Sequence, residues 1–162
     1  MSKSLKRVEA ALAAAGVAVR IHEAVAETRT ADQAAAEAGC SVDQIVKSII
    51  FRAEASGRIC LFLTPGGARI DPARASALAG EALGRADAEQ VRAATGFAIG
   101  GVAPVGHMTP VPVWADERLL EFPQVWAAAG TPRHIFAIAP ADLIRVSGAR
   151  IARFIAGRPA GV

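Results

Sequence analysis

Two short apolar runs, separated by only four residues, constrain the fold of this chain more than any other feature of its sequence. Residues 45–53 and 58–64 consist largely of isoleucine, leucine, valine and phenylalanine, and the sequence Glu-Ala-Ser-Gly connects them. This pattern predicts a β-hairpin. Because the second run, from Ile59 to Leu63, shows no alternation of polar and apolar residues, we expect both faces of that strand to be buried.

Helical spacing of apolar residues, with a capping residue before it or a glycine after it, recurs along the rest of the chain. The predicted helices cover residues 2–15, 31–38, 72–79, 87–94 and 140–146, with one further helical turn at 116–120. Further short strands are expected at 17–21, 111–115, 125–129 and 134–139, and a shaped loop rich in glycine and proline at 100–112. The sequence therefore predicts one mixed α/β domain over residues 1–156, followed by a frayed tail at 157–162.

The composition is that of an ordinary globular protein. Of 162 residues, 52% are hydrophobic and 20% are charged, which excludes a disordered or collagen-like chain. No apolar run approaches the ~20 residues that span a bilayer, and the N-terminal segment lacks a secretory apolar region, so we expect neither a membrane association nor export. Cys40 and Cys60 suit neither a disulfide framework nor a zinc site, and a cytoplasmic location is expected. The net charge of +3 is compatible with a nucleic-acid partner without requiring one.

Familiar catalytic motifs are absent from the sequence. It contains no GxSxG, HExxH, CxxC or Walker motif, and no GxGxxG after a predicted strand. His22, His107 and His134 are far apart and lack metal-ligand spacing, so no metal site is predicted. The absence of tyrosine disfavours a nucleic-acid partner bound by broad aromatic stacking. An enzyme with this sequence would not rely on a recognisable protein nucleophile or metal.

Lys47 is the one lysine outside the start of the chain, where Lys3 and Lys6 lie. With the two-residue period of a strand it shares a face with Ile45 and Ile49, the more apolar face. An ammonium group there must reach water, pair with a carboxylate, or hold an anionic or carbonyl ligand. The structural alternative is a lysine at a sheet edge that discourages aggregation.

A second unusual segment is the loop with the sequence GGVAPVG at 100–106. Gly100 and Gly101 permit positive φ angles and a close approach of a ligand to the backbone, and Pro104 stiffens the chain that follows. Backbone N–H and C=O groups in such a loop can line an oxyanion or ester site without a charged side chain. The alternative is a plain connection between a helix and a strand.

Together these segments resemble the YbaK/EbsC family, which includes free-standing aminoacyl-tRNA deacylases and the editing insertion domain of bacterial prolyl-tRNA synthetases. The matching stretches are AET at 26–28, QIVKSIIF at 44–51, GGVAPVG at 100–106, VPVWAD at 111–116 and AAGTPRHIFAIAPADL at 128–143. The resemblance implies a curved mixed β-sheet surrounded by helices. It also implies hydrolysis of the ester that joins a wrongly attached amino acid to the 3′-terminal adenosine of tRNA.

The same resemblance implies which residues form the site. Lys47 is expected to orient the terminal adenosine and its phosphate, and Gly100 to place backbone groups around the ester and the attacking water. The expected substrate-binding residues are Thr30, Gly101, Val102, Ala103, Pro104, Asp116, Gly130 and His134. Structural alternatives remain open for three of these residues. Thr30 and Asp116 are also candidate helix caps, and the functional role expected of Asp116 is to orient Lys47 or a loop amide. His134 is also a candidate hydrogen-bonded strand residue.

The resemblance also implies a substrate class. A small amino acid such as alanine or serine is expected, with cysteine and threonine as further candidates, attached to the tRNA for proline or to a related tRNA. Mischarged tRNA is the expected partner and an aminoacyl-tRNA synthetase a candidate second one, whereas no cofactor and no DNA are expected. The alternative is a regulatory module that binds the end of a tRNA, or an aminoacyl-adenosine, without turnover.

Overall fold

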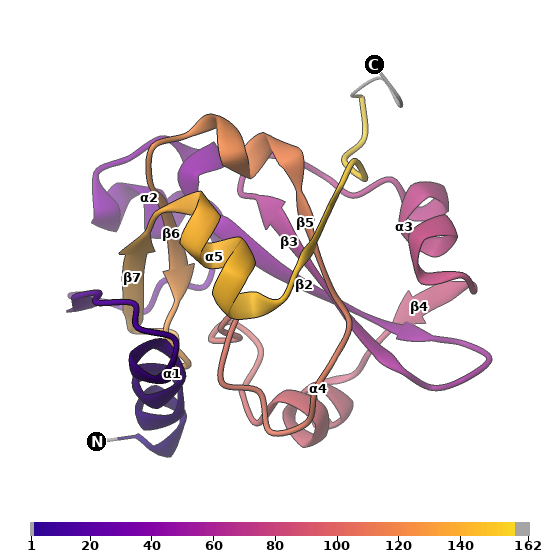
Figure 1. Ribbon diagram of the computed structural model, residues 1–162, viewed down its shortest axis with the longest axis horizontal. Helices are drawn as coiled ribbons and strands as arrows, with labels where there is room; N and C mark the ends of the chain where they lie inside the picture. The colour runs from indigo at the N-terminus through magenta and orange to yellow at the C-terminus, as the bar shows by residue number, and fades with distance from the viewer. Residues whose placement is uncertain (1, 158–162) are drawn as a thin grey trace.

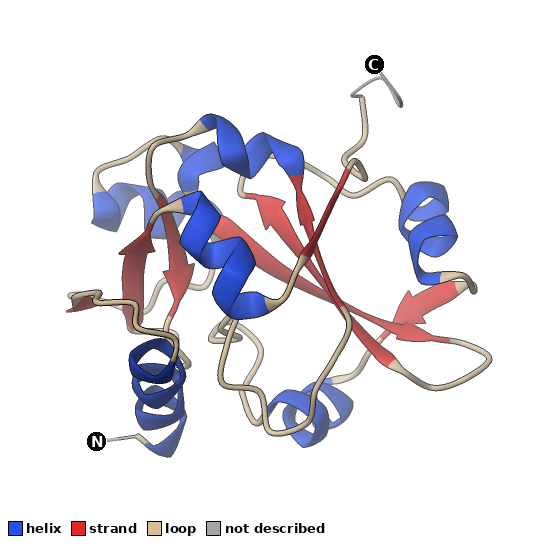
Figure 2. Cartoon of the chain, viewed as in Figure 1, coloured by secondary structure: helices blue, strands red, loops and turns tan. Residues whose placement is uncertain are grey.

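The computed structural model describes residues 2–157, so the predicted frayed tail lies, except for Gly157, outside the described residues. The helices are α1 (Lys3–Ala14), α2 (Ala31–Ala38), α3 (Pro72–Ala79), α4 (Ala88–Thr95) and α5 (Pro140–Ser147), with 3₁₀ turns η1 (Val42–Gln44) and η2 (Glu117–Glu121). The strands are β1 (Ile21–Glu23), β2 (Val46–Ala53), β3 (Ile59–Pro65), β4 (Leu83–Arg85), β5 (Val113–Asp116), β6 (Val125–Ala128), β7 (His134–Ile138) and β8 (Arg150–Ala152). Figures 1 and 2 show the helices placed around the outside of these strands.

The strands form two sheets. One has five strands in the order β4-β2-β3-β5-β8 and mixes parallel and antiparallel pairs, and the other is the antiparallel order β1-β7-β6. A single parallel bridge between Ile45 and Trp126 joins the start of β2 to β6. The expected mixed α/β fold is therefore confirmed, with the curved sheet divided into two parts that meet beside β2.

The predicted hairpin is confirmed and forms the centre of the larger sheet (Figure 1). β3 pairs antiparallel with β2 on one side and parallel with β5 on the other. Leu61 and Leu63 belong to the main hydrophobic cluster, while Phe62 belongs to a second cluster, in which its ring stacks on Trp114 at 4.9 Å between ring centroids. Both faces of β3 are buried, as its unbroken apolar sequence predicts.

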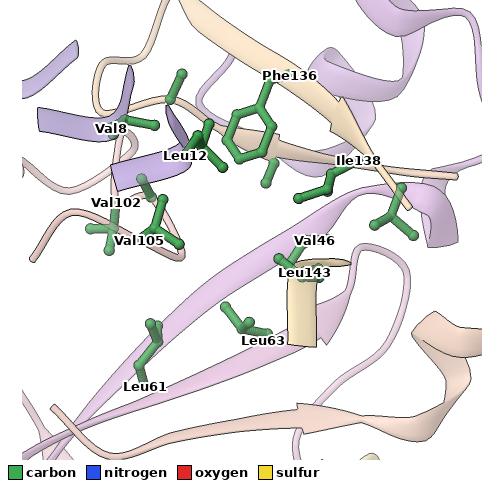
Figure 3. Packing of buried hydrophobic residues seen from close by; sticks show 14 of the residues in the cluster. Val8, Leu12, Val46, Leu61, Leu63, Val102, Val105, Phe136, Ile138 and Leu143 are labelled. Atoms are coloured by element: carbon green, nitrogen blue, oxygen red, sulfur yellow. The ribbon is translucent and has the colours of Figure 1, made fainter. Parts of the chain in front are cut away.

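The main hydrophobic cluster anchors the glycine- and proline-rich loop. Val102 and Val105 of this loop are buried with Val8 and Leu12 of α1, and they lie close to one another in Figure 3. Phe136 of β7 belongs to the same cluster. The loop has no helix or strand of its own, as predicted, but its apolar side chains fix it to the core.

Local signals set the helix boundaries. Ser2, Thr30, Asp71 and Asp87 each cap a helix through a side-chain oxygen, and α2 ends at Gly39 with a left-handed φ of 69°. Each of these boundaries lies within one or two residues of the prediction. Among residues 2–157 no helix has both the length and the apolar character of a membrane span.

One predicted strand needs correction, and two strands of the structure were not predicted. Residues 17–20 are not a strand, because the Val17 amide closes α1 by donating to Leu12 and the chain pairs with β7 only from Ile21 onward. The three-residue strands β4 and β8 were not predicted. Both form because the fold brings them to a partner strand, β4 to β2 and β8 to β5. Segments this short carry too little periodicity to identify a strand.

Candidate functional site

A cavity of about 640 Å³ lies between the start of α2, strand β2, the loop around Gly100 and strands β6 and β7. This volume falls within the range of roughly 300–1,000 Å³ that is typical of small-molecule sites. Most of the wall is apolar and includes Ile45, Val46, Ile49, Ile50, Phe51, Val91, Ile99, Val102, Trp126 and Ile135. The polar side chains of the wall are Thr28, Arg29, Thr30, Asp32, Lys47, Ser48 and Arg85. An apolar cavity with a few convergent polar groups is the arrangement expected of a binding site.

Lys47 lies on β2 at the wall of this cavity and is partly buried. Its ammonium donates a hydrogen bond of 2.7 Å to the carbonyl oxygen of Ala68, in the turn after β3. Burial, and secondarily the nearby Arg69 guanidinium, lower the pKa of Lys47, while Asp43 and Asp32 act in the opposite direction. The bond to Ala68 uses one of the three donors of the ammonium, so two remain for a ligand.

Lys47 also lies at an edge of the larger sheet. β4 pairs with β2 only at Phe51–Ala53, so in the part of β2 that contains Lys47 the one strand partner is β3. The geometry therefore agrees with the structural alternative of an edge lysine, and also with a binding role. The cavity beside Lys47 and the fixed position of its ammonium favour the binding role.

Gly100 and Gly101 are glycine for two different reasons. Gly100 lines the cavity with a φ of +93°, which side chains rarely tolerate, although a Cβ there would come no closer than 3.8 Å to Arg29. Gly101 lies behind the wall, where a Cβ would stand 2.8 Å from the Thr131 Cα atom. A side chain at Gly101 would therefore meet the Thr131 backbone, which occupies that space.

The segment before α2 forms another part of the wall. Thr30 lines the cavity and also caps α2, its Oγ1 accepting from the Gln33 amide at 3.2 Å. The Thr28 amide and hydroxyl both donate to the Pro132 carbonyl oxygen, at 2.7 and 3.2 Å. These bonds hold the start of α2 against the turn before β7.

Asp116 lies away from the cavity wall. It is 1% exposed, and its two carboxylate oxygens accept from the amides of Arg118 and Phe154, at 3.0 and 3.1 Å. Neither oxygen contacts Lys47 or the loop at 100–106. The geometry agrees with the structural alternative for Asp116, the cap of the helical turn that follows it.

Gly130 and His134 lie outside the cavity wall. Gly130 has a φ of +98° and lies against Ser4 and Phe97, so a Cβ there would stand 2.9 Å from the Ser4 carbonyl oxygen. The His134 ring is hydrogen-bonded through Nδ1 to the Thr131 hydroxyl at 2.6 Å and does not line the cavity.

Ala103 and Pro104 are buried in the loop, outside the cavity wall, and the Ala103 carbonyl is bonded to His107 Nε2 at 2.7 Å. Of the ten predicted site residues, the structure thus brings Thr30, Lys47, Gly100 and Val102 to one cavity.

Sequence reasoning did not assign Asp32, Ser48 or Arg85 to the site. Arg85 belongs to β4, which is too short to predict. Ser48 neighbours Lys47 and reaches the wall because the unpaired edge of β2 exposes it. Among the described residues no three His, Cys, Asp or Glu side chains gather as a metal site would require.

Comparisons with known proteins point to one family. The model of the aminoacyl-tRNA editing domain matches residues 25–146, a range that contains every residue of the cavity wall. The Bacillus subtilis protein described as "Uncharacterized protein YwhH" is 30% identical over 122 residues, which are 75% of this chain and 77% of that protein. A solved structure described as "a putative trans-editing enzyme for prolyl tRNA synthetase" is 47% identical, with a TM-score of 0.89 over 97% of this chain and 99% of that one. The structure of "hypothetical protein APE2540" is 30% identical, with a TM-score of 0.85 over 92% and 99%.

Proposed function

This chain belongs to the aminoacyl-tRNA editing domain family, and from this premise we propose that it hydrolyses the ester bond of mischarged tRNA at the 3′-terminal adenosine. The observation that supports the proposal most is that Lys47 and Gly100 line the same cavity of about 640 Å³. A cationic side chain and a half-buried glycine backbone in one apolar cavity suit a substrate that combines a phosphate with an acyl ester.

In this proposal the Lys47 ammonium binds the phosphate of the terminal nucleotide. A compact ammonium acts as a point charge, and the bond to Ala68 fixes its position before the substrate arrives. Because the group is partly buried, its attraction to an anion is screened less than at an exposed site. Binding the phosphate then places the ester within the cavity.

Backbone groups around Gly100 stabilise the tetrahedral intermediate in this proposal. Water attacks the carbonyl carbon of the ester, the bond from that carbon to the ribose oxygen breaks, and the oxygen leaves with a proton. The products are a free amino acid and a tRNA with a free terminal hydroxyl. Fixed donors aimed at the developing oxyanion contribute several kcal/mol, about 2.7–4 for one donor where this has been measured.

Ser48 is the one hydroxyl that neighbours Lys47 on the wall, but it lacks the partner that a nucleophile needs. Within the described part of the chain no histidine or carboxylate is hydrogen-bonded to it. A serine hydroxyl is a weak nucleophile unless an adjacent base activates it. Water is therefore the nucleophile in our proposal, and Ser48 contributes to the polarity of the wall.

The proposed substrate carries a small amino acid such as alanine or serine on the tRNA for proline. Two observations support this choice: the similar structure whose description names prolyl tRNA synthetase, and a wall formed largely by apolar side chains. A site of this kind separates substrates that differ by one methylene by only ~1–3 kcal/mol, so several small amino acids remain candidate substrates.

A panel of mischarged tRNAs tests this function. We expect release of a small amino acid from at least one member, and a large loss of release in Lys47→Met but not in Lys6→Met, which changes an exposed lysine of α1. Binding of tRNA without release from any member would instead support a non-catalytic module. If phosphate contacts carry the binding, the tRNA affinity falls as the salt concentration rises, and a flat response would contradict them.

A further inference from the structure

The charged residues of the cavity wall are unequally divided by sign. Three are basic, Arg29, Lys47 and Arg85, and one is acidic, Asp32. The basic residues suit the phosphates of a tRNA end. Such a tRNA end brings no cation of its own, so the phosphates alone give no reason for a carboxylate in this wall.

Asp32 lies in the first turn of α2, two residues after Thr30. Its carboxylate has no hydrogen bond and no ion pair with any of the residues 2–157. It is exposed, so water occupies its lone pairs until a ligand arrives. A free carboxylate in a cavity wall is a site for a cationic group of a ligand.

Two observations relate the position of Asp32 to the two groups that the proposed reaction uses, the Lys47 ammonium and the backbone at Gly100. It is close enough to Lys47 to oppose the lowering of the pKa of that ammonium, but the two side chains do not form an ion pair. The start of α2 also lies beside the Gly100 loop, since Arg29 is the side chain nearest to Gly100. Gly100 and Asp32 thus line the same cavity, and the wall residues 29–32 lead along the chain from the neighbourhood of Gly100 to Asp32.

An aminoacyl ester carries a cation at a fixed place. Its α-ammonium group is one carbon away from the carbonyl carbon that water attacks, whereas the phosphate lies beyond the ribose. We propose that Asp32 binds this α-ammonium group, so that the site selects esters with a free amine over esters whose amine is acylated. This inference rests on the proposed function and adds a specificity residue to it.

The competing account of Asp32 is structural. An acidic residue in the first turn of a helix stabilises the helix through its dipole, without any ligand. Glu89 has the same place in α4, as the second residue of that helix, and it is exposed and outside the cavity wall. Glu89→Gln is therefore a matched control for Asp32→Asn, because both changes remove one charge from the same position of a short helix.

The test compares alanyl-tRNA with N-acetylalanyl-tRNA as substrates. A hydrogen bond between charged groups is worth about a tenfold preference or more, so we expect the unmodified protein to favour the free amine by at least that factor in kcat/KM. Asp32→Asn should reduce this preference toward one by slowing the free-amine substrate alone. Glu89→Gln should leave the preference unchanged. No preference in the unmodified protein, or an equal loss on both substrates in Asp32→Asn, would overturn the role.

A binding experiment separates this inference from the proposed function. The probes are 3′-alanylamino-3′-deoxyadenosine, whose amide linkage replaces the ester, and its N-acetyl form, measured by calorimetry. We expect the free-amine probe to bind more tightly, and Asp32→Asn to remove the difference. If neither tRNA is hydrolysed but the difference is seen, the proposed hydrolysis fails and the role of Asp32 stands. Equal affinities, or no binding of either probe, would refute the role of Asp32.

Discussion

The Lys47 ammonium lies 2.7 Å from the carbonyl oxygen of Ala68, and this bond fixes a charged group at the wall of an apolar cavity. Burial lowers the pKa of Lys47, which means that folding disfavours its charged form. The position of this side chain therefore brings a cost in stability, which a role in binding an anion would explain.

The first prediction concerns this cost. Lys47→Met keeps a side chain of similar length, removes the partly buried charge and leaves the Ala68 carbonyl without its donor. These effects oppose each other, so the free energy of unfolding should change by no more than about 1 kcal/mol. Deacylation should fall by at least about a hundredfold, measured beside the melting temperature. A clear loss of stability with normal turnover would show that Lys47 serves only the fold.

The second prediction separates Gly100 from Gly101. Gly101→Ala places a Cβ atom 2.8 Å from the Thr131 Cα, and the backbone cannot easily yield, so we expect destabilisation by about 1–3 kcal/mol in urea unfolding. Gly100→Ala meets no atom closer than 3.8 Å, but its φ of +93° costs a similar amount, about 1–3 kcal/mol.

The two alanine variants should differ in activity. At a temperature where both remain folded, Gly100→Ala should lower kcat, because Gly100 lines the cavity, whereas Gly101→Ala should retain most of it. Gly100→Asn serves as a further control for the backbone, since asparagine tolerates positive φ better than alanine does. Full activity of Gly100→Ala would contradict the proposed role of this backbone.

The third prediction concerns Asp116, which accepts from the amides of Arg118 and Phe154. Asp116→Ala leaves both amides without their partner in a buried position, so we expect destabilisation by about 2–4 kcal/mol. Asp116→Asn keeps one good acceptor and should lose less. Both variants should keep normal kcat when folded, and a selective loss of kcat would restore a role for Asp116 at Lys47.

The fourth prediction is a pH dependence of stability from His107. Burial lowers the pKa of His107, Arg7 lowers it further, and the bond from Nε2 to the Ala103 carbonyl acts in the opposite direction. The folded state therefore binds this proton less readily than the unfolded state, whose histidine pKa is about 6.5. The contribution of His107 is complete above that pH and is lost as the pH falls through the lower folded value.

Urea unfolding between pH 7 and pH 5.5 measures this effect. His107→Gln keeps a donor for the Ala103 carbonyl but does not titrate, so its stability should fall less steeply over this range. Equal slopes for the two proteins would show that His107 does not carry this dependence.

Much of the fold follows from local signals in the sequence. α2 begins after Thr30 because the side chains of Thr30 and Gln33 form a capping box, and these two residues are three positions apart. The hairpin of β2 and β3 follows from two apolar runs with a short turn between them. In each case the interacting residues are neighbours in the chain, so the pattern of residue types is sufficient.

The site could be predicted in part. The odd lysine of an apolar strand and the paired glycines of a loop identified Lys47 and Gly100, and both line the cavity. By residue type, Asp116 and His134 were also suitable for a polar role in the site. In the structure, however, they are hydrogen-bonded outside the cavity wall, Asp116 to the Phe154 amide and His134 to the Thr131 hydroxyl. Residue type alone does not say where a side chain finds its hydrogen bond.

By itself the sequence determined the helices, the hairpin and its buried strand, because propensity, capping and periodicity act over a few residues. Only the tertiary structure decided that β4 and β8 are strands, that Gly101 packs on Thr131, and that Asp32 and Arg85 share a wall with Lys47. These relationships join residues far apart in the chain, and their energy comes from packing and pairing that exist only once the whole domain has folded.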